Sequence, residues 1–176
     1  MAEELDHIRK RLLAEGDKTI AFFENLTDID WNNKVYSSGS GWRIREILAH
    51  FISAERAYQG YLQEVLEGGL GASSDFDIDK FNETDVATMD GLPPSKLIDT
   101  YRSTREKTLR LTTNMEDSDL GKQAYHPWFE EKEVGWYLKL IYRHNTMHLQ
   151  DVRKSLRTGE PVPDSDQHRT GRSIDP

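Results

Sequence analysis

The sequence has no cysteine among its 176 residues. This absence excludes a disulfide framework, a thiolate metal site and a cysteine nucleophile. Long hydrophobic runs are also missing, and none approaches the roughly 20 apolar residues that cross a bilayer, so we expect no membrane partner. The first residues, MAEELDHIRKRLL, are charged throughout. We therefore expect no secretory signal and a cytoplasmic protein.

Basic residues are outnumbered, with 23 Lys and Arg against 31 Asp and Glu, which gives a net charge of −8 with neutral histidines. Because binding to a phosphate backbone depends on clustered basic residues, we expect no nucleic-acid partner. The length is typical of one domain and is sufficient to bury a core without disulfides or a structural metal.

Four segments repeat apolar residues at three- and four-residue spacing, the pattern of amphipathic helices. They are residues 3–26, 42–66, 94–115 and 133–156. Residues 72–92 are less regular and have room for a short helix, and residues 116–132 form a loop with room for a short extended piece. The sequence therefore predicts an all-α four-helix bundle, with a long crossover connection between its second and third helices. We assign residues 1–157 to the bundle and residues 158–176 to a C-terminal tail, extended or flexible.

Histidines are the side chains that point most directly to chemistry. His144 and His148 are four residues apart in YRHNTMHLQ, so they share one inward helix face, and His50 lies on another inward face in REILAHFISAER. Imidazoles in a core are costly unless something satisfies them, and a divalent cation does so. Three histidine ligands with open positions are typical of a catalytic metal site. The simpler interpretation, hydrogen-bonded core histidines that share a face by chance, stays open.

Several established motifs are absent. The H-E-x-x-H motif needs a glutamate after its first histidine, and Asn145 follows His144. Di-iron bundles need two E-x-x-H pairs with further inward glutamates, and the sequence has a single E-x-x-H, at Glu4 and His7. No Walker, G-x-G-x-x-G or G-x-S-x-G motif occurs either.

Substrate-binding candidates are Trp128 and Arg43. Trp128 and Phe129, in YHPWFE, are placed to line a pocket beside the metal, although tryptophans near helix ends are more often core plugs. Arg43 is placed to bind an anionic substrate, although an arginine at a helix start is more often solvated. We expect His126 to be a solvent-exposed loop residue, and we consider Glu46 and Glu55 as carboxylates that could orient His50.

The ordered set WRIREILAH, FNET and HNTMH resembles the DinB-like (damage-inducible) metal-binding four-helix-bundle family over roughly residues 5–157. The resemblance implies that His50, His144 and His148 bind a divalent metal, zinc or nickel, and that the protein is a homodimer. Bacillithiol transferases and mycothiol-dependent maleylpyruvate isomerases are related, which implies a low-molecular-weight thiol. The family often has a capping serine where this sequence has Arg43.

Two functions are consistent with these observations. The first is a metal-dependent enzyme of the thiol S-transferase type, in which the metal activates a small thiol, or water, toward an electrophilic small-molecule substrate. Since the chain has no cysteine, the thiol would come from the substrate side. The alternative is a non-catalytic, metal-stabilised helical dimer that acts as a binding or stress-response protein.

Overall fold

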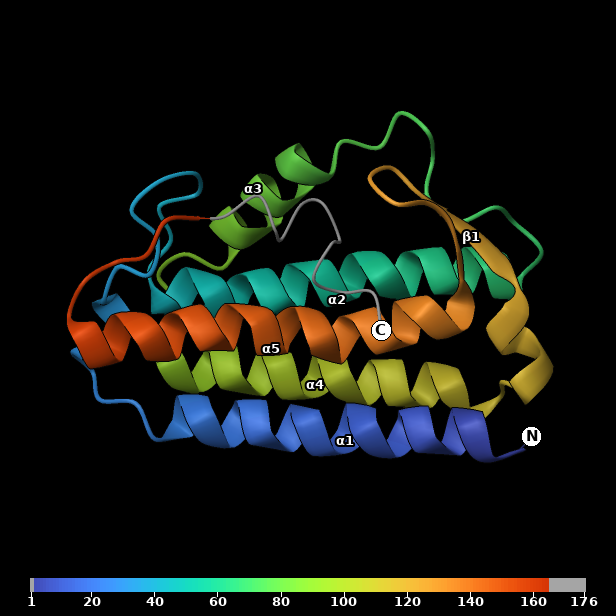
Figure 1. The fold of residues 1–176 in the computed structure, drawn as a ribbon, viewed down its shortest axis with the longest axis horizontal. Coiled ribbons are helices and arrows are strands. Elements are labelled where there is room, and N and C mark those ends of the chain that lie inside the picture. The colour runs from blue at the N-terminus through green and yellow to red at the C-terminus, as the bar shows by residue number, and fades with distance from the viewer. Residues whose placement is uncertain (1, 165–176) are drawn as a thin grey trace.

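The computed structural model describes residues 2–164, which form mainly helices (Figure 1). Four long helices are accompanied by a shorter helix, two 3-10 helices and two strands. In chain order these are α1 (Ala2–Glu24), η1 (Asp30–Asn32), α2 (Ile44–Leu66), α3 (Ile78–Thr88), α4 (Pro94–Thr113), η2 (Asp117–Gly121), β1 (Gln123–His126), β2 (Glu130–Glu133) and α5 (Val134–Thr158). The four long helices confirm the all-α bundle, and each of their ends lies within two residues of the predicted position.

The helix ends follow from local chemistry. Pro94 begins α4 as the first helical residue, where a missing N–H costs nothing. Gly159 ends α5 with a φ of 73°, a left-handed conformation that glycine adopts readily. At the start of α2 the backbone N–H of Arg43 donates to Oε2 of Glu46 at 2.8 Å. This is the glutamate half of a capping box, and it satisfies the N–H of Arg43 rather than the helix N–H from which a capping serine would accept.

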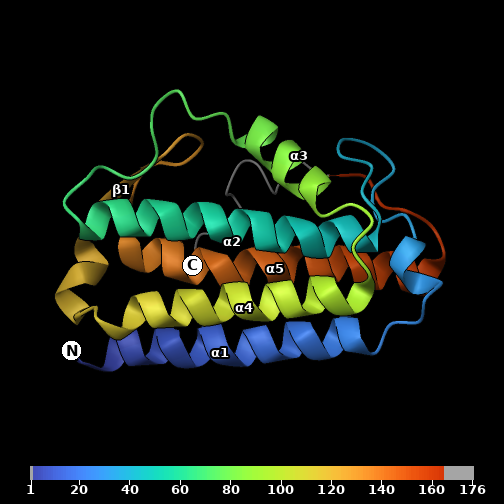
Figure 2. The ribbon, with the colours of Figure 1, turned by 180° about the vertical axis from the view of Figure 1, so that it is seen from behind.

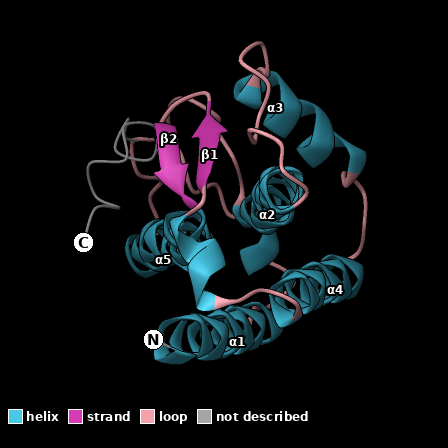
Figure 3. Cartoon of the chain, turned by 90° about the vertical axis from the view of Figure 1, so that its right-hand side faces the viewer, coloured by secondary structure: helices cyan, strands magenta, loops and turns pink. Residues whose placement is uncertain are grey.

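The long helices lie side by side along the length of the bundle (Figures 1 and 2) and occupy its corners when it is seen end-on (Figure 3). Both α1 and α2 pack against α4 and α5. The connection at residues 67–93 returns the chain along the bundle, so α2 and α4 run in the same direction (Figure 1). This connection is the predicted crossover. It contains α3, which packs on the outer side of α2 (Figure 3).

Residues 116–132, predicted as a loop, contain η2 and the start of a β-hairpin. In this hairpin β1 pairs antiparallel with β2, with Gln123 opposite Glu133. Tyr125 also bonds to the α2–α3 connection, because its N–H donates to Leu70 and its carbonyl accepts from Ala72. Gly71 lies between these contacts with a φ of 95°, and a Cβ there would lie 2.8 Å from the Tyr125 nitrogen. The hairpin and α3 therefore lie on the same side of α2 (Figure 3).

Two apolar clusters fill the bundle, one at the hairpin end and one at the opposite end. Along α5 the first cluster includes Tyr142 and the second begins at Leu149, so His144 and His148 lie between the two. Within residues 2–164, no helix combines the length and the hydropathy that a membrane crossing requires.

The segment after α5 docks onto the bundle in extended form. Val162 forms a parallel bridge with Tyr36, and its side chain is buried in the second cluster. Its N–H donates to the carbonyl of Val35, and its carbonyl accepts from the N–H of Ser37. In the predicted tail of residues 158–176, residue 158 is thus the last residue of α5, and the segment that follows it docks onto the bundle. Residues 165–176 lie outside the described part of the chain.

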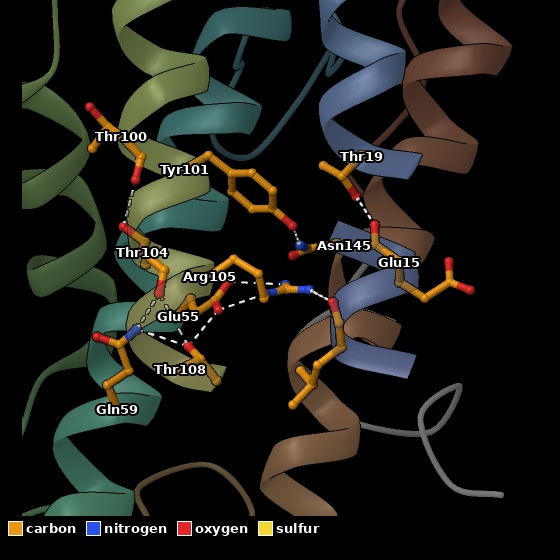
Figure 4. Close-up of polar contacts among 11 residues, drawn as sticks. Glu15, Thr19, Glu55, Gln59, Thr100, Tyr101, Thr104, Arg105, Thr108 and Asn145 are labelled. Carbon is orange, nitrogen blue, oxygen red and sulfur yellow. Dashed lines mark hydrogen bonds and ion pairs between the residues drawn. The ribbon is translucent and has the colours of Figure 1, made fainter. Parts of the chain in front are cut away.

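A polar network joins three helices inside the bundle (Figure 4). Arg105 donates to both carboxylate oxygens of Glu55, at 2.8 and 3.0 Å, and to the carbonyl of Leu12 at 2.7 Å. The hydroxyl of Thr108 donates to Glu55 at 2.6 Å. Gly16 on α1 gives Arg105 the space that it needs, because a Cβ there would lie 3.1 Å from Cγ of the arginine.

Candidate metal centre

Three imidazole rings meet in the interior between α2 and α5. Nε2 of His144 lies 3.0 Å from Nε2 of His50 and 3.2 Å from Nε2 of His148. Exposed fractions of 6%, 7% and 3% for residues 50, 144 and 148 show that all three rings are buried. One ligand atom from each ring lies within 4.8 Å of the other two, so the three residues could hold a metal ion.

The protons of these rings show why a cation fits. A ring nitrogen of a neutral imidazole carries either a proton or a lone pair, so Nε2 of His144 cannot donate to one neighbour and accept from the other. One cation accepts a lone pair from each ring and removes this conflict. Nitrogen ligands at 2.0–2.1 Å from a tetrahedral zinc ion lie about 3.3 Å apart, close to the two contacts in this structure. The histidines therefore fit a divalent metal.

Tyr36 fixes the protonation of one ring. Its hydroxyl donates to Oδ2 of Asp151 at 3.1 Å and lies 2.6 Å from Nδ1 of His148. The hydroxyl has a single proton, so His148 must donate from Nδ1, which leaves the Nε2 lone pair directed at the other rings. Burial, reinforced by the Asp151 carboxylate, raises the pKa of Tyr36, so the phenol keeps this proton.

Aromatic side chains fix the orientation of the remaining rings. The indole of Trp42 packs against His50 with ring centroids 4.6 Å apart and ring planes tilted by 37°. Phe51 contacts His144 and His148 at 6.1 and 5.9 Å between centroids. A rigid, apolar surrounding of this kind holds the three nitrogens in place and strengthens electrostatic interactions among them.

The histidines line one part of a pocket of about 790 Å³, enclosed by α2, α3, α5 and the hairpin. This volume is typical of small-molecule sites. Trp128 and Arg43, the two predicted substrate-binding residues, both line it. Trp128 is 38% exposed. The guanidinium of Arg43 already forms an ion pair with Glu46, so an anionic ligand would have to compete with that carboxylate.

Three expectations about neighbouring residues are wrong. His126 is not a solvent-exposed loop residue, because it ends β1, is 1% exposed and lines the same pocket. Glu46 and Glu55 do not orient His50, because their carboxylates bind Arg43 and Arg105. Glu46 shares a face of α2 with His50, but its carboxylate is turned toward Arg43, whereas Glu55 leaves the helix on another face, toward Arg105.

Sequence reasoning missed Tyr36 and Asp151. A signal existed for Asp151, because a residue three positions after His148 lies on the same helix face. No comparable signal existed for Tyr36, which reaches the centre from the irregular segment before α2.

The fold and the site together define a helical bundle with a buried three-histidine centre. The model of the mycothiol maleylpyruvate isomerase N-terminal domain matches residues 12–153. The chain therefore belongs to this family, which confirms the DinB-like resemblance. A search of curated protein sequences gives no match.

Solved structures share this fold at low sequence identity. The sibling lethal factor precursor DfsB has a TM-score of 0.71 at 15% identity, covering 92% of this chain and all of its own. An uncharacterised protein from Clostridium difficile 630 has a TM-score of 0.70 at 14% identity, covering 89% and 98%. YfiT from Bacillus subtilis has a TM-score of 0.66 at 19% identity, covering 90% of each chain, and is described as a probable metal-dependent hydrolase with an unusual four-helix bundle topology.

Proposed function

We propose that this protein is a metal-dependent enzyme in which His50, His144 and His148 bind a divalent cation that activates a small thiol, or water, toward an electrophilic substrate. The observation that carries the proposal is the convergence of three buried imidazole nitrogens in the wall of a large pocket. A structural metal site is normally closed by four protein ligands, whereas three ligands beside a pocket leave a coordination position for substrate.

The cation would supply Lewis acidity, which lowers the pKa of a thiol or a water molecule toward neutrality. The residues of the chain have separate tasks. His148 is held as the Nδ1–H tautomer by Tyr36, and Tyr36 is held by Asp151. Trp42 fixes the plane of His50. This arrangement keeps three lone pairs aimed at one point without rearrangement.

A thiol is favoured over water by the family to which the chain belongs, since mycothiol is a small thiol. In the transfer, the thiol sulfur forms a bond to an electrophilic carbon, the leaving group departs with its electron pair, and the thiol proton passes to solvent. Water is favoured by the description of YfiT as a probable metal-dependent hydrolase. Hydrolysis also needs a general base, and Asp79 and Glu83 of α3 line the pocket.

Zinc and nickel are the metals that we propose first, because both accept imidazole nitrogen. Within the pocket we propose Trp128 and Arg43 as substrate contacts, the first through its ring and the second through its guanidinium. We also propose that the protein is a homodimer, which size-exclusion chromatography with light scattering tests directly.

The decisive experiment is the metal content of protein purified without chelator. We expect about one divalent cation per chain. His148→Ala should lose it, whereas His7→Ala should keep it, because His7 is an exposed histidine on α1. Absence of metal in the unmodified protein would overturn the proposal.

A thiol titration then separates catalysis from a purely structural role. With cobalt in place of the native metal, binding of a small thiol to an open coordination position changes the visible absorption spectrum. We expect such a change with cysteine or with an aminosugar thiol. A spectrum that no thiol alters would favour the non-catalytic, metal-stabilised dimer.

A further inference from the structure

The hairpin end of the pocket has a chemistry of its own. We call it the hairpin subsite and define it by His126, Trp128 and Phe129 from the hairpin and by Tyr58 and Tyr61 from α2, all of which line the pocket. The His126 ring lies 4.6 Å from Phe129, 5.7 Å from Tyr61 and 6.1 Å from Tyr58 and Trp128, between centroids. None of the five rings is a charged group, so this end offers flat, neutral surfaces.

His126 contributes a directed hydrogen-bond donor. Its Nδ1 accepts from the backbone N–H of Trp128 at 3.0 Å, so its proton must be on Nε2. Burial lowers the pKa of His126 to about 4, in agreement with a neutral ring. No residue in the range 2–164 accepts a hydrogen bond from Nε2, so this donor is available to a ligand.

Tyr61 contributes a second polar group. It is 6% exposed, and its hydroxyl is buried with no hydrogen-bond partner among the described residues. Burial raises the pKa of both Tyr58 and Tyr61, so their hydroxyls stay protonated and can donate. An unsatisfied buried hydroxyl is costly, and a bound acceptor would remove that cost.

The subsite is within reach of the metal centre. Tyr58 follows His50 by eight residues on α2, which corresponds to about 12 Å along the helix axis. The pocket is continuous between them, and Ala54 and Ala57 line the intervening stretch. Their small side chains leave room for a ligand that extends from one end of the pocket to the other.

We infer that the hairpin subsite binds a neutral, planar group that carries a hydrogen-bond acceptor, namely an aromatic or conjugated carbonyl. The rings stack on the planar part, while Nε2–H of His126 and the Tyr61 hydroxyl donate to the carbonyl oxygen. This inference rests on the proposed function in one respect, since it assigns the carbonyl compound as the electrophilic substrate, with the thiol at the metal end. With such a substrate the sulfur adds to the carbonyl or conjugated carbon, the π electron pair moves to the carbonyl oxygen, and the thiol proton ends on the adduct, so no leaving group is required.

Three probes of similar size test the inference on metal-replete protein: acetophenone, ethylbenzene, which lacks the acceptor, and cyclohexyl methyl ketone, which lacks the aromatic ring. Each is titrated by isothermal calorimetry, and NMR shifts of the Trp128 indole locate the binding. We expect acetophenone to bind about fivefold to tenfold more tightly than either other probe. Equal binding of all three probes, or binding away from Trp128, would overturn the inference.

Two variants identify the donors. Tyr61→Phe should weaken the binding of acetophenone severalfold and leave the binding of ethylbenzene unchanged. It should also raise the melting temperature of the free protein, because an unsatisfied hydroxyl is removed. His126→Phe should also weaken the binding of acetophenone severalfold. Tyr142→Phe, at a buried tyrosine outside the pocket, should change none of these values. If both subsite variants bind acetophenone as the unmodified protein does, the assignment is wrong.

Metal content is measured in every sample, so that the proposed function and the hairpin subsite can be tested independently of each other. A protein that binds acetophenone as expected but no metal contradicts the proposed function alone. A protein that binds metal but does not distinguish the probes contradicts the hairpin subsite alone.

Discussion

The hydroxyl of Tyr36 lies 2.6 Å from Nδ1 of His148, although the two residues are 112 positions apart in the chain. The contact joins the segment before α2 to the middle of α5. Because the same hydroxyl donates to Asp151, the contact determines which nitrogen of His148 carries the proton. The tautomer that the proposed metal site requires is thus set by a residue outside the three histidines.

Replacing this tyrosine with phenylalanine should weaken metal binding without unfolding the protein. Tyr36→Phe removes the hydroxyl that orients His148, and loss of such an outer contact typically costs 10-fold to 100-fold in metal affinity. Competition with a chromophoric chelator measures the change. Tyr142→Phe serves as the matched control, because Tyr142 is also a buried tyrosine and lies outside the pocket. Equal affinities in the two variants would show that the hydroxyl does not act on the metal.

Metal should raise the melting temperature. A cation that binds only the folded chain stabilises it by about 2.7 kcal/mol when its free concentration is 100 times its dissociation constant. For a chain of this size that corresponds to a shift of about 5–10 °C. We expect the shift in differential scanning calorimetry with added zinc or nickel. It should disappear in His50→Ala, and a shift of the same size in that variant would place the cation elsewhere.

His126 should make the protein less stable in mild acid. Burial lowers its pKa to about 4, whereas the unfolded chain has the ordinary value of 6.5. Between these pH values the unfolded state binds a proton at His126 that the folded state does not bind. The contribution of His126 to the free energy of unfolding is therefore complete above pH 6.5 and is lost as the pH falls toward 4. The full loss is on the order of 3 kcal/mol.

Urea unfolding at several pH values, with chelator present, measures this dependence. His126→Phe should lose less stability than the unmodified protein between pH 6.5 and 4, because groups other than His126 titrate alike in both. His7→Gln is the control at an exposed histidine and should keep the full dependence. Parallel curves for the unmodified protein and His126→Phe would contradict the prediction.

The buried ion pair between Glu55 and Arg105 should be costly to break from one side. Their side chains are 2% and 4% exposed, so either single substitution leaves a charge in the core. We expect Glu55→Leu or Arg105→Met to lower the free energy of unfolding by about 3–5 kcal/mol, and the double variant to recover most of that loss.

An exposed pair provides the comparison. Lys139 and Glu4 are 2.9 Å apart with side chains 32% and 61% exposed, so Lys139→Ala should cost less than about 1 kcal/mol. Denaturant titrations of the two single variants, their double variant and Lys139→Ala measure the free energy of unfolding of each. The buried pair would have no special role if its single variants were as stable as Lys139→Ala.

Most of the bundle could be predicted from the sequence because its helices have strong periodic patterns and clear end signals. Pro94 and Gly159 mark a helix start and a helix end through their backbone preferences alone. The three histidines were predictable for the same reason, since spacing on a helix determines which face a side chain occupies. The 3.2 Å contact between His144 and His148 follows from their spacing on α5, but the approach of His50 to 3.0 Å depends on how α2 packs against α5, which no local pattern contains.

The remaining features depend on contacts between distant segments. The burial of His126 follows from the hairpin folding back toward α2, and its short strands have little signal in a charged stretch. Arg105 looks like a surface residue until Glu55 and the carbonyl of Leu12 are placed beside it. Charged and irregular segments were therefore the ones that sequence reasoning misplaced.

The docked segment after α5 has a consequence for how the chain can be shortened. Val162 holds the backbone on both sides of Tyr36, through Val35 and Ser37. Removing the residues beyond Thr158 would release that backbone and, with it, the proton arrangement at His148. A trimmed chain could keep every imidazole and every long helix and still lose the tautomer that the proposed cation needs, so expression boundaries for this protein should extend past Asp164.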